Sequence, residues 1–419
     1  MLINFQVANY KSIMDSAVIN FEASSLTELQ EENVIGRQRI NLLKSIILNG
    51  ANASGKSKIL DALAFVRDMV LNSATDRKVT AQINTEPFLL NLDSLAKPSR
   101  FELEFHLGEK RYRYGFLADE KEIHQEWLLE VRASTLKEVF IRANDEFHIN
   151  EKKFQGSDGL AQRTRKNALF LTVAAQWNVG LAEEISGWFD SIYIVNGMED
   201  NQYKSLTTKM VQQDEYKDRI NNLIREADLG IKEIQIVEGS DEDLNRYIKL
   251  LGEGLSDTFL RNLGRRDNSV FTVHNVYDSN GSPVSDTTFP MKSKESEGTK
   301  KFYNLAGLLI DAIEKGRLVV FDEMDARLHS LLTRAIVLLF NCKDNRNGGQ
   351  LLAVSHDSTL MDNQLLRRDQ IYFVEKDQQE ATRITSLAEF KVRKDSPYSK
   401  NYLEGKYGGI PFIDNLEVN

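Results

Sequence analysis

The sequence predicts an α/β protein with a mixed central sheet, an antiparallel β lobe and an inserted helical subdomain. The apolar run Ser45–Asn49 is followed, after Lys56, by apolar residues at helical spacing, which indicates a buried parallel strand and then a helix. Apolar and polar residues alternate strictly from Phe101 to Leu107, as in a half-buried antiparallel strand. Residues from about 180 to 265 have a mostly helical pattern, which supplies the predicted helical subdomain.

The remaining elements are predicted in chain order from the same periodicities. The first segment, with apolar residues from Leu2 to Phe21, is typical of a hairpin, and residues 100–149 of an antiparallel lobe. The clearest helices are expected at Met210–Ala227 and Asp243–Leu263, and further strands at Phe271–Val273, Leu318–Phe321, Leu351–Val354 and Ile371–Val374. We therefore expect three parts: residues 1–179 with the β lobe, a helical insert at 180–284, and a closing part at 285–419.

Composition narrows the class of protein. The 419 residues carry a formal net charge of −9, which does not favour constitutive, charge-driven DNA binding. The single cysteine, Cys342, excludes an internal disulfide framework and fits a reducing compartment. No signal peptide is evident at the start, and no apolar stretch approaches the ~20 residues that span a bilayer. We expect a cytoplasmic protein that does not bind membranes.

The segment Gly50–Ser57 fits the phosphate-loop pattern G-x-x-x-x-G-K-[ST] at every fixed position, between a predicted strand and a predicted helix. Backbone N–H groups of such a loop bind phosphate oxygens, the lysine adds charge, and the hydroxyl of the final serine can bind Mg²⁺. The predicted cofactors are ATP and Mg²⁺. The loop residues expected to bind them are Asn52, Ser54, Gly55, Lys56 and Ser57.

A pair of acidic residues ends the apolar strand Leu318–Phe321. Two adjacent carboxylates at the end of a buried strand are costly unless they have a function. Beside a phosphate loop, Asp322 would hold Mg²⁺, directly or through water, together with Ser57, and Glu323 would polarise the attacking water. The sequence thus predicts Asp322 as a metal ligand and Glu323 as a catalytic residue.

Several weaker motifs follow the same order along the chain. Glu295–Lys300 precedes a helical pattern, Asp325–His329 follows the acidic pair, and Ser355–Asp357 follows the next strand. Each is common when taken singly, and their order and spacing are what is informative. A fourth candidate, Gln176, is equally compatible with an ordinary helix glutamine.

With these motifs the chain resembles the ABC-ATPase heads of chromosome-maintenance and DNA-repair proteins. It is more closely similar to the compact RecF-like and OLD-like ATPases of bacterial abortive-infection and restriction-linked phage defence. The resembling residues also include Asn9–Ser12 and Tyr402–Pro411. The resemblance spans both ends of the chain and is thinnest from about 180 to 265. It implies a phosphate-loop NTPase fold of the ABC-ATPase head class.

The resemblance also implies roles for individual residues. Ser296 and Gly298 of the signature would contact the γ-phosphate held by a second subunit, in a head-to-tail homodimer. His356 would be the switch histidine that senses this phosphate, Asp325 would lie at the subunit boundary, and Gln176 would serve as the Q-loop glutamine. The signature lacks the leucine and the second glycine of transporter forms.

Three functions remain open at this point. The first is an ATP-hydrolysing switch subunit of an anti-phage defence system, which controls a toxic or nuclease partner. The second is a DNA-repair ATPase that clamps DNA, using Arg163–Lys166 and Arg261 with Arg265 and Arg266, although solvated surface charge is the more common role of such residues. The third is a nucleotide-locked scaffold that scarcely turns over.

Overall fold

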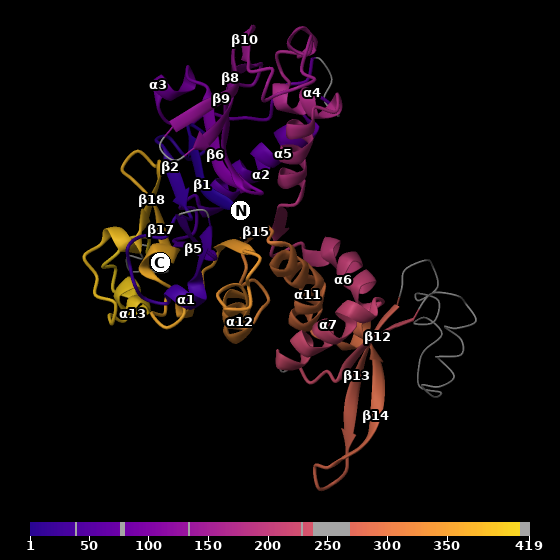
Figure 1. Cartoon of the computed structure of the whole chain (residues 1–419). Helices are drawn as coiled ribbons and strands as arrows, with labels where there is room; N and C mark the ends of the chain where they lie inside the picture. The colour runs from indigo at the N-terminus through magenta and orange to yellow at the C-terminus, as the bar shows by residue number, and fades with distance from the viewer. Residues whose placement is uncertain (38–39, 76–79, 133–134, 228, 238–268, 411–419) are drawn as a thin grey trace, which may run out of the picture. The chain divides into compact units, whose positions relative to one another are not determined.

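The computed structural model describes residues 1–37, 40–75, 80–132, 135–227, 229–237 and 269–410. Contacts within the chain divide it into two compact units (Figure 1). Unit 1 comprises Met1–Val195, Ile313–Met324 and Val337–Asn419, and unit 2 comprises Asn196–Ala312 and Asp325–Ile336. Residues that are far apart in the sequence therefore share each unit.

A seven-stranded antiparallel sheet forms the β lobe of unit 1. Its order is β10-β9-β8-β7-β6-β1-β2, and every neighbouring pair is antiparallel. Its strands are β1 (Leu2–Ala8), β2 (Ala17–Asn20), β6 (Ser99–Leu107), β7 (Lys110–Ala118), β8 (Ile123–Arg132), β9 (Thr135–Ala143) and β10 (Glu146–Ile149). The predicted hairpin at the start and the predicted antiparallel lobe are confirmed, and they belong to one sheet.

A six-stranded mixed sheet contains the strand that precedes the phosphate-loop motif. Its order is β11-β15-β16-β5-β17-β18. The strands are β5 (Ser45–Gly50), β11 (Tyr193–Asn196), β15 (Leu318–Asp322), β16 (Gln350–Val354), β17 (Ile371–Lys376) and β18 (Thr382–Ser386). Strands β15, β16, β5 and β17 are parallel, and β18 is antiparallel to β17. The mixed sheet and the strands predicted at 318–321, 351–354 and 371–374 are confirmed.

Helix α2 (Lys56–Asn72) connects the two sheets of unit 1. Its apolar residues recur at helical spacing, and Ile59, Leu63, Val66, Met69 and Val70 are buried. The helix contacts β1 of one sheet and both β5 and β15 of the other. Burying one apolar stripe against two sheets fixes the N-terminus of α2, which follows the phosphate loop, at the end of β5.

Smaller elements complete unit 1 and its boundary. The helices are α1 (Gln30–Asn33), α3 (Leu92–Leu95), α4 (Phe170–Gln176), α5 (Gly180–Asp190), α12 (Ser330–Phe340) and α13 (Tyr398–Leu403). A small ladder pairs β3 (Val34–Arg37) with β4 (Ile40–Leu43). Short 3-10 helices of unit 1 are η1 (Ala161–Arg163), η3 (Ser358–Leu360), η4 (Arg368–Gln370) and η5 (Leu387–Glu389), whereas η2 (Asp200–Tyr203) belongs to unit 2.

Unit 2 combines helices with a three-stranded antiparallel sheet, in the order β12-β13-β14. Its elements are α6 (Lys204–Val211), α7 (Asp214–Glu226), β12 (Glu233–Val237), β13 (Ser269–Tyr277), β14 (Pro283–Pro290), α10 (Met291–Lys294) and most of α11 (Glu297–Lys315). Helix α11 packs closely on α6, since a Cβ at Gly307 would lie 2.7 Å from the Cα of Thr207. Strands β11, β12 and β14 were not predicted from the sequence.

The predicted continuous helix Met210–Ala227 is wrong at its start. The chain leaves α6 after Val211, and Gln213 has the extended angles φ −101° and ψ 124° before α7 begins at Asp214. The predicted helix Asp243–Leu263 lies outside the described residues. Contacts place α5 in unit 1, whereas the division at 180 and 285 remains a prediction.

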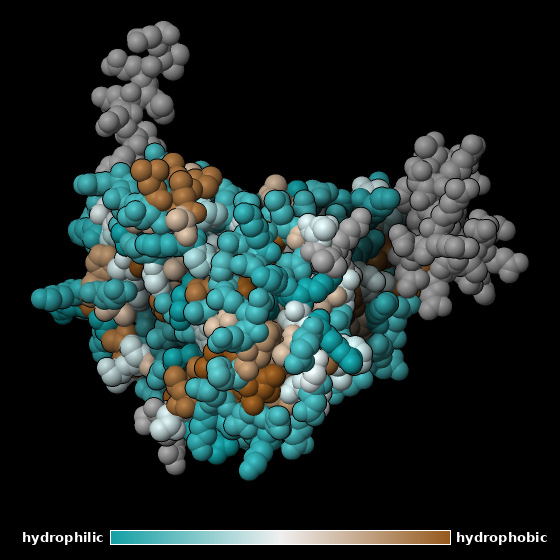
Figure 2. Space-filling model, turned by 90° about the horizontal axis from the view of Figure 1, so that it is seen from above, coloured by the Kyte–Doolittle hydropathy of each residue, from teal (hydrophilic) through white to brown (hydrophobic). Residues whose placement is uncertain are grey.

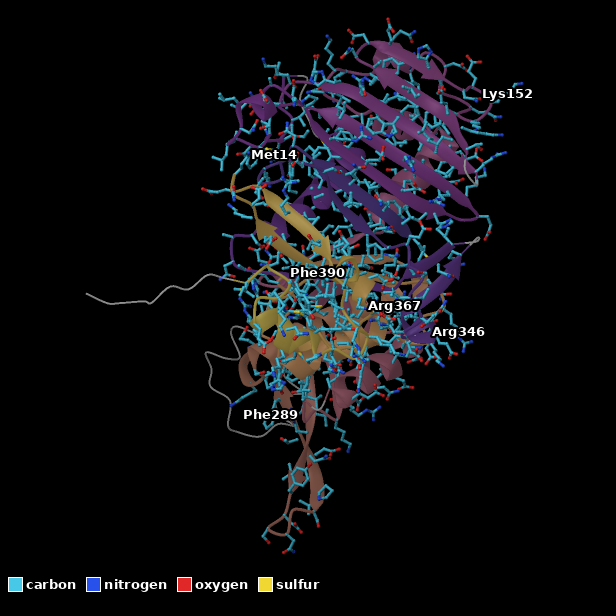
Figure 3. All side chains as sticks on the ribbon, turned by 90° about the vertical axis from the view of Figure 1, so that its left-hand side faces the viewer. Met14, Lys152, Phe289, Arg346, Arg367 and Phe390 are labelled. Carbon is cyan, nitrogen blue, oxygen red and sulfur yellow. The ribbon has the colours of Figure 1, made fainter. Side chains whose placement is uncertain are left out.

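A buried ion pair anchors the segment before α1 in unit 1. Arg367 forms two hydrogen bonds with Asp369, at 2.9 Å and 2.8 Å, and donates to the carbonyls of Leu26 and Glu28. Asp369 in turn accepts from the backbone N–H and the hydroxyl of Ser24. Figure 3 shows Arg367 surrounded by other side chains of unit 1, whereas Arg346 lies at the periphery of the side chains drawn. The pair thus ties residues 24–28 to the loop before β17.

Arg367→Ala is expected to lower the free energy of unfolding by about 3–5 kcal/mol, because it leaves the buried Asp369 carboxylate without its cationic partner. Arg346→Ala is the matched control: the Arg346 side chain is 82% exposed, and its loss should change stability by less than ~0.5 kcal/mol. Urea denaturation followed by circular dichroism measures both. Equal midpoints for the two variants would contradict the anchoring role of Arg367.

The surface is largely hydrophilic on the face that Figure 2 shows, with separate apolar patches. Exposed leucines in and beside α3 include Leu89, Leu90 and Leu92, with 54%, 62% and 86% of their surface accessible. Among the described residues, no helix combines the length and the apolar character needed to cross a membrane.

Candidate nucleotide site

Four parallel strands bring the predicted catalytic segments to one edge of the mixed sheet. The carboxyl ends of β15, β16, β5 and β17 lie at the same edge because these strands are parallel. The phosphate loop follows β5, Asp322 ends β15, and His356 follows β16, which pairs with both. Ligands bind at this edge in open α/β sheets. The fold therefore brings the phosphate loop to the same edge as Asp322 and His356, which follow it by more than 260 residues in the sequence.

Two glycines are required by the close approach of the chain around the phosphate loop. A Cβ at Gly50 would lie 2.1 Å from the carbonyl oxygen of Val374 in β17. Gly55 has φ +101°, and a Cβ there would lie 2.0 Å from Oγ1 of Thr382. No side chain fits at either position, so the loop backbone stays close to the sheet with its N–H groups available for phosphate oxygens.

Lys56 lies within the curve of this loop. Its ammonium donates to the carbonyl oxygens of Gly50 at 2.8 Å and Ala51 at 2.7 Å, and only 5% of the residue is exposed. Ser54 is buried as well, whereas Asn52 is exposed. The structure thus concentrates the charge of Lys56 at the loop, as expected of a group that binds phosphate.

Ser57 and Asp322 meet across 265 residues of sequence. The Ser57 hydroxyl donates to Oδ1 of Asp322 at 3.1 Å, and the backbone N–H of Glu323 donates to the same oxygen at 3.1 Å. Burial raises the pKa of Asp322, and the nearby carboxylates of Glu323 and Asp61 raise it further. The hydrogen bond from Ser57 lowers the pKa but does not reverse the shift. A cation at this point would stabilise the ionised carboxylate.

Glu323 has an unusual backbone conformation. Its φ is +50°, in the left-handed region that non-glycine residues seldom adopt. The chain on both sides is fixed, because Asp322 ends β15 and the N–H of the fully buried Met324 donates to the carbonyl of Val354 at 3.0 Å. Such strain is frequent at functional residues. The conformation lies directly after Asp322, the metal-ligand candidate, where a catalytic carboxylate is predicted.

His356 is exposed in the segment that leaves β16. The residues on both sides of it are held in place: the N–H of Asp357 donates to Oγ of the buried Ser355 at 3.0 Å, and the Asp357 carboxylate caps η3 through Thr359. This arrangement places the imidazole on a short, anchored segment at the edge where the loop and the acidic pair lie.

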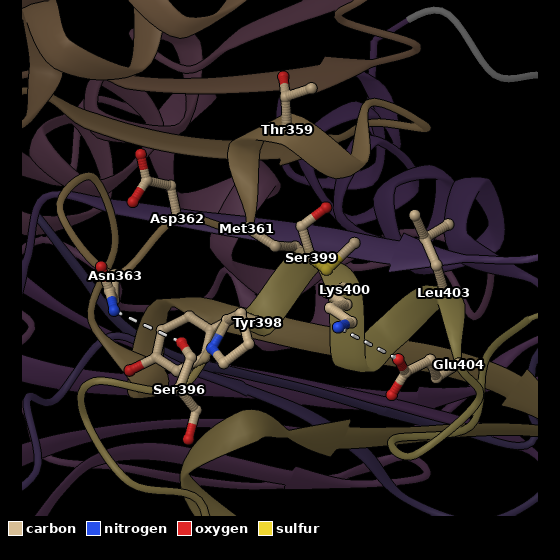
Figure 4. Close-up of a pocket in the computed structure, with 11 residues that line it drawn as sticks. Thr359, Met361, Asp362, Asn363, Ser396, Tyr398, Ser399, Lys400, Leu403 and Glu404 are labelled. Atoms are coloured by element: carbon tan, nitrogen blue, oxygen red, sulfur yellow. Dashed lines mark hydrogen bonds and ion pairs between the residues drawn. The ribbon is translucent and has the colours of Figure 1, made fainter.

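A cavity of about 610 Å³ lies beyond this segment, between residues 359–363 and residues 396–404 of α13 and its flanks (Figure 4). Asn363 donates to the carbonyl of Ser396 at 3.4 Å across it, and Lys400 pairs with Glu404 at 4.0 Å. None of the predicted site residues lines this cavity. The candidate nucleotide site at the sheet edge is therefore separate from this pocket.

Two groups of contacts behind the phosphate loop, one around Thr382 and one around Gly409, are not predicted from the sequence. The Ser12 and Thr382 hydroxyls lie 2.8 Å apart, and Thr382 donates to the carbonyl of Ser54 at 3.0 Å. The Glu375 carboxylate accepts from the N–H of Gly409 at 3.0 Å, and a Cβ at Gly409 would lie 3.6 Å from Cα of Gly50. The only sequence signals near these contacts are the segments Asn9–Ser12 and Tyr402–Pro411. The spacing of the residues does not show which parts of the chain these segments contact.

The signature residues lie in unit 2, at the start of α11. Ser296 caps this 19-residue helix, because its hydroxyl accepts from the N–H of Thr299 at 3.1 Å. A Cβ at Gly298 would lie 2.9 Å from the carbonyl of Arg327, so the signature turn and the Asp325–His329 segment are in close contact. The structure therefore brings these two motifs together, with helix N–H groups at Ser296 that suit an anion.

Gln176 is the exposed last residue of α4. Among the described residues, no hydrogen bond or ion pair joins it to the phosphate loop, and its assignment to the Q-loop stays a prediction. The basic residues considered for DNA have partners within unit 1: Arg163 lies over the Trp177 ring, Arg165 donates to the carbonyls of Ser73 and Ala74, and Lys166 pairs with Glu122. Arg261, Arg265 and Arg266 lie outside the described residues.

These residues fit the predicted cofactors. Gly50, Gly55 and Lys56 form a tight, positively charged loop that suits phosphate groups. The hydroxyl of Ser57 and the carboxylate of Asp322 are hard oxygen ligands in contact with each other, and Mg²⁺ binds through one or two such groups together with the phosphates of the nucleotide. The site is thus compatible with Mg²⁺-ATP.

Comparison with known proteins agrees with this site. A family model described as "AAA domain, putative AbiEii toxin, Type IV TA system" matches residues 45–362, a range that includes the loop, the signature, the acidic pair and His356. No curated protein matches the chain.

Several solved structures are similar to the chain at low identity. One is an Smc head bound to the C-winged helix domain of ScpA, 14% identical, covering 92% of this chain and 97% of that chain with a TM-score of 0.46. The SMC head domain from Thermotoga maritima is 15% identical and covers 92% and 98%, with a TM-score of 0.41. An Smc head from Pyrococcus furiosus, with an extended coiled coil and bound to the C-terminal domain of ScpA, is 13% identical and covers 92% and 96%, with a TM-score of 0.39.

Proposed function

The chain belongs to the AbiEii-type AAA domain family, and from this premise we propose that it is an ATP-hydrolysing switch subunit of a bacterial anti-phage defence system. Two copies would pair around ATP and, while paired, control a toxic or nuclease partner in the cytoplasm. The observation that carries the proposal is the contact between Ser57 and Asp322 beside Lys56, in a family whose description refers to a toxin–antitoxin system.

Each site residue has a chemical role in this proposal. The loop N–H groups and Lys56 bind the β- and γ-phosphates, and Ser57 with Asp322 holds Mg²⁺, which when bound neutralises charge on the phosphate oxygens. Glu323 accepts a proton from the attacking water. His356, on its anchored segment after β16, donates a hydrogen bond to the γ-phosphate and reports its presence to the rest of the unit.

The signature completes the site from a second copy. Ser296 and the N-terminal turn of α11 offer a hydroxyl and backbone N–H groups, which suit the γ-phosphate face that Lys56 and Ser57 leave open. A two-fold arrangement that exchanges these groups gives two equivalent composite sites. ATP then holds the pair together, and hydrolysis releases it, which makes a switch controlled by nucleotide state.

A plaque assay tests the defence role. Cells that carry the gene with its natural neighbours are expected to reduce phage plaquing, and Lys56→Ala should abolish this protection because phosphate binding is lost. Lys343→Ala is the matched control, since Lys343 is an exposed surface residue with partners in Glu31 and Glu32. Protection that survives Lys56→Ala would overturn the proposal.

The family description supports a second candidate, in which this chain is itself the toxic component. Expression of the chain alone separates the two. Growth arrest that depends on Lys56 and is relieved by a neighbouring gene product identifies a toxin, whereas normal growth supports the switch. The DNA clamp is supported less well, because Arg163, Arg165 and Lys166 already have partners; steeply salt-dependent DNA binding would favour it.

A further inference from the structure

The residue directly before the signature serine is held by a side-chain clamp on the neighbouring sheet. The Glu295 side chain is 10% exposed. Its Oε1 accepts from the Thr272 hydroxyl at 2.6 Å and lies 2.9 Å from Nε2 of His274. A buried carboxylate is costly without such partners. The backbone at Glu295 is also fixed, since its N–H donates to the carbonyl of Met291 at 3.2 Å.

Both clamp residues come from one face of strand β13. Thr272 and His274 are two positions apart, so their side chains point to the same side of the strand. His274 Nε2 lies 3.1 Å from the Thr272 hydroxyl, and its ring lies 5.2 Å from that of Phe289 on β14. Because a carboxylate only accepts, Nε2 carries the hydrogen in the contact with Glu295. The ring orientation is thus set by two strands.

The clamp acts on the start of the signature helix. Ser296 follows Glu295 without an intervening residue, and its hydroxyl is directed by the cap on Thr299. The peptide that joins Glu295 to Ser296 is therefore held between a buried carboxylate on one side and the first turn of α11 on the other. Small displacements of a phosphate-binding group have large effects on rate.

We propose that Thr272 and His274 are positioning residues, which set the signature of one copy against the γ-phosphate held by the other copy by fixing Glu295. This inference rests on the composite ATP site of the proposed function. It predicts where a clamp variant lowers the rate of hydrolysis. The affected site is the one on the partner copy, which receives the signature of the variant chain, and not the site at the variant chain's own phosphate loop.

Steady-state kinetics of the purified full chain give the first test. His274→Ala should lower kcat about tenfold, because a hydrogen bond to a buried carboxylate is lost, while the affinity of the isolated chain for ATP stays unchanged. His274→Gln retains an N–H donor and should restore most of the rate. His148→Ala is the matched control, since His148 is exposed on β10 and should have wild-type kinetics.

Hybrids of two variants distinguish a positioning role from a purely structural one, because a purely structural role would not make the rate depend on which chain carries the clamp substitution. In a hybrid of one His274→Ala chain and one Lys56→Ala chain, only one site can work. Its phosphate loop comes from the His274→Ala chain, and its signature, with an intact clamp, comes from the Lys56→Ala chain. Its rate should therefore equal that of a hybrid of one wild-type chain and one Lys56→Ala chain. When the Lys56→Ala chain also carries His274→Ala, the tenfold defect should return. If His274→Ala does not fold, Glu295→Gln, which retains the shape of the side chain, takes its place.

The outcomes separate the inference from the proposed function. Wild-type kcat in His274→Ala, or a defect that the Lys56→Ala partner does not relieve, overturns the clamp. If a hybrid of Ser296→Arg with Lys56→Ala also stays inactive although subunits exchange, the composite site itself is wrong, whatever His274 does.

Discussion

Glu323→Gln is expected to lower phosphate release by at least about a hundredfold while ATP stays bound. Glutamine keeps the shape of the side chain but cannot accept a proton from the attacking water, and general-base catalysis contributes roughly 10²–10⁴ in rate. The chain around Glu323 is fixed by β15 and by the contact of Met324 with Val354, so the amide should occupy the same place. Phosphate-release assays and filter binding of labelled ATP measure the two effects.

Two comparisons make this result interpretable. Lys56→Ala should lose ATP binding as well as turnover, because it removes the positive charge that binds the phosphates. Glu31→Gln, an exposed glutamate paired with Lys343, should behave as wild type. Unchanged turnover in Glu323→Gln would remove Glu323 from the chemistry. Wild-type turnover indistinguishable from background hydrolysis in the absence of protein, with ATP bound, would instead indicate a nucleotide-locked scaffold.

Mixing two inactive variants is expected to restore ATP hydrolysis. Ser296→Arg should retain ATP binding but lose turnover, and Lys56→Ala should lose binding. In a hybrid pair, the loop of the Ser296→Arg chain meets the intact signature of the Lys56→Ala chain, which leaves one working site. Free exchange of equal amounts makes half of the pairs hybrid, each with one of two sites active, so about a quarter of wild-type activity should return.

The physical basis of this test is the helix start at α11, whose N–H groups and Ser296 hydroxyl suit an anion. Subunit exchange has to be shown independently, for instance by energy transfer between labelled chains. If exchange occurs and the mixture remains inactive, the signature acts within its own chain or not at all, and the shared-site proposal fails.

The local motifs could be predicted from the sequence because their chemistry is contiguous. The phosphate loop has fixed glycines, a lysine and a serine within Gly50–Ser57, and the structure shows why each glycine is needed. The acidic pair was recognisable because it ends an apolar strand, and its contact with Ser57 followed from the parallel order of β5, β16 and β15.

What the sequence could not supply depends on partners that are distant along the chain. No spacing rule relates Ser12 to Thr382, or His274 to Glu295, because such contacts arise only after the strands are in place. The break between α6 and α7 has no proline or glycine to mark it. Helix α7 is also held by a tertiary contact, in which the N–H of Ile234 donates to the side chain of Asn221. Local helix propensity does not encode such contacts.

The position of β5 in its sheet has a consequence for the synthesis of the protein. Both of its neighbours, β16 and β17, begin about 300 residues later in the chain, and at 5–20 residues per second a ribosome needs roughly 15–60 s to make that length. Throughout this interval the segment that becomes the phosphate loop has no sheet on which to be ordered. A nascent chain is therefore expected to bind nucleotide only after β16 and β17 have been made, and products that stop before these strands would remain inert.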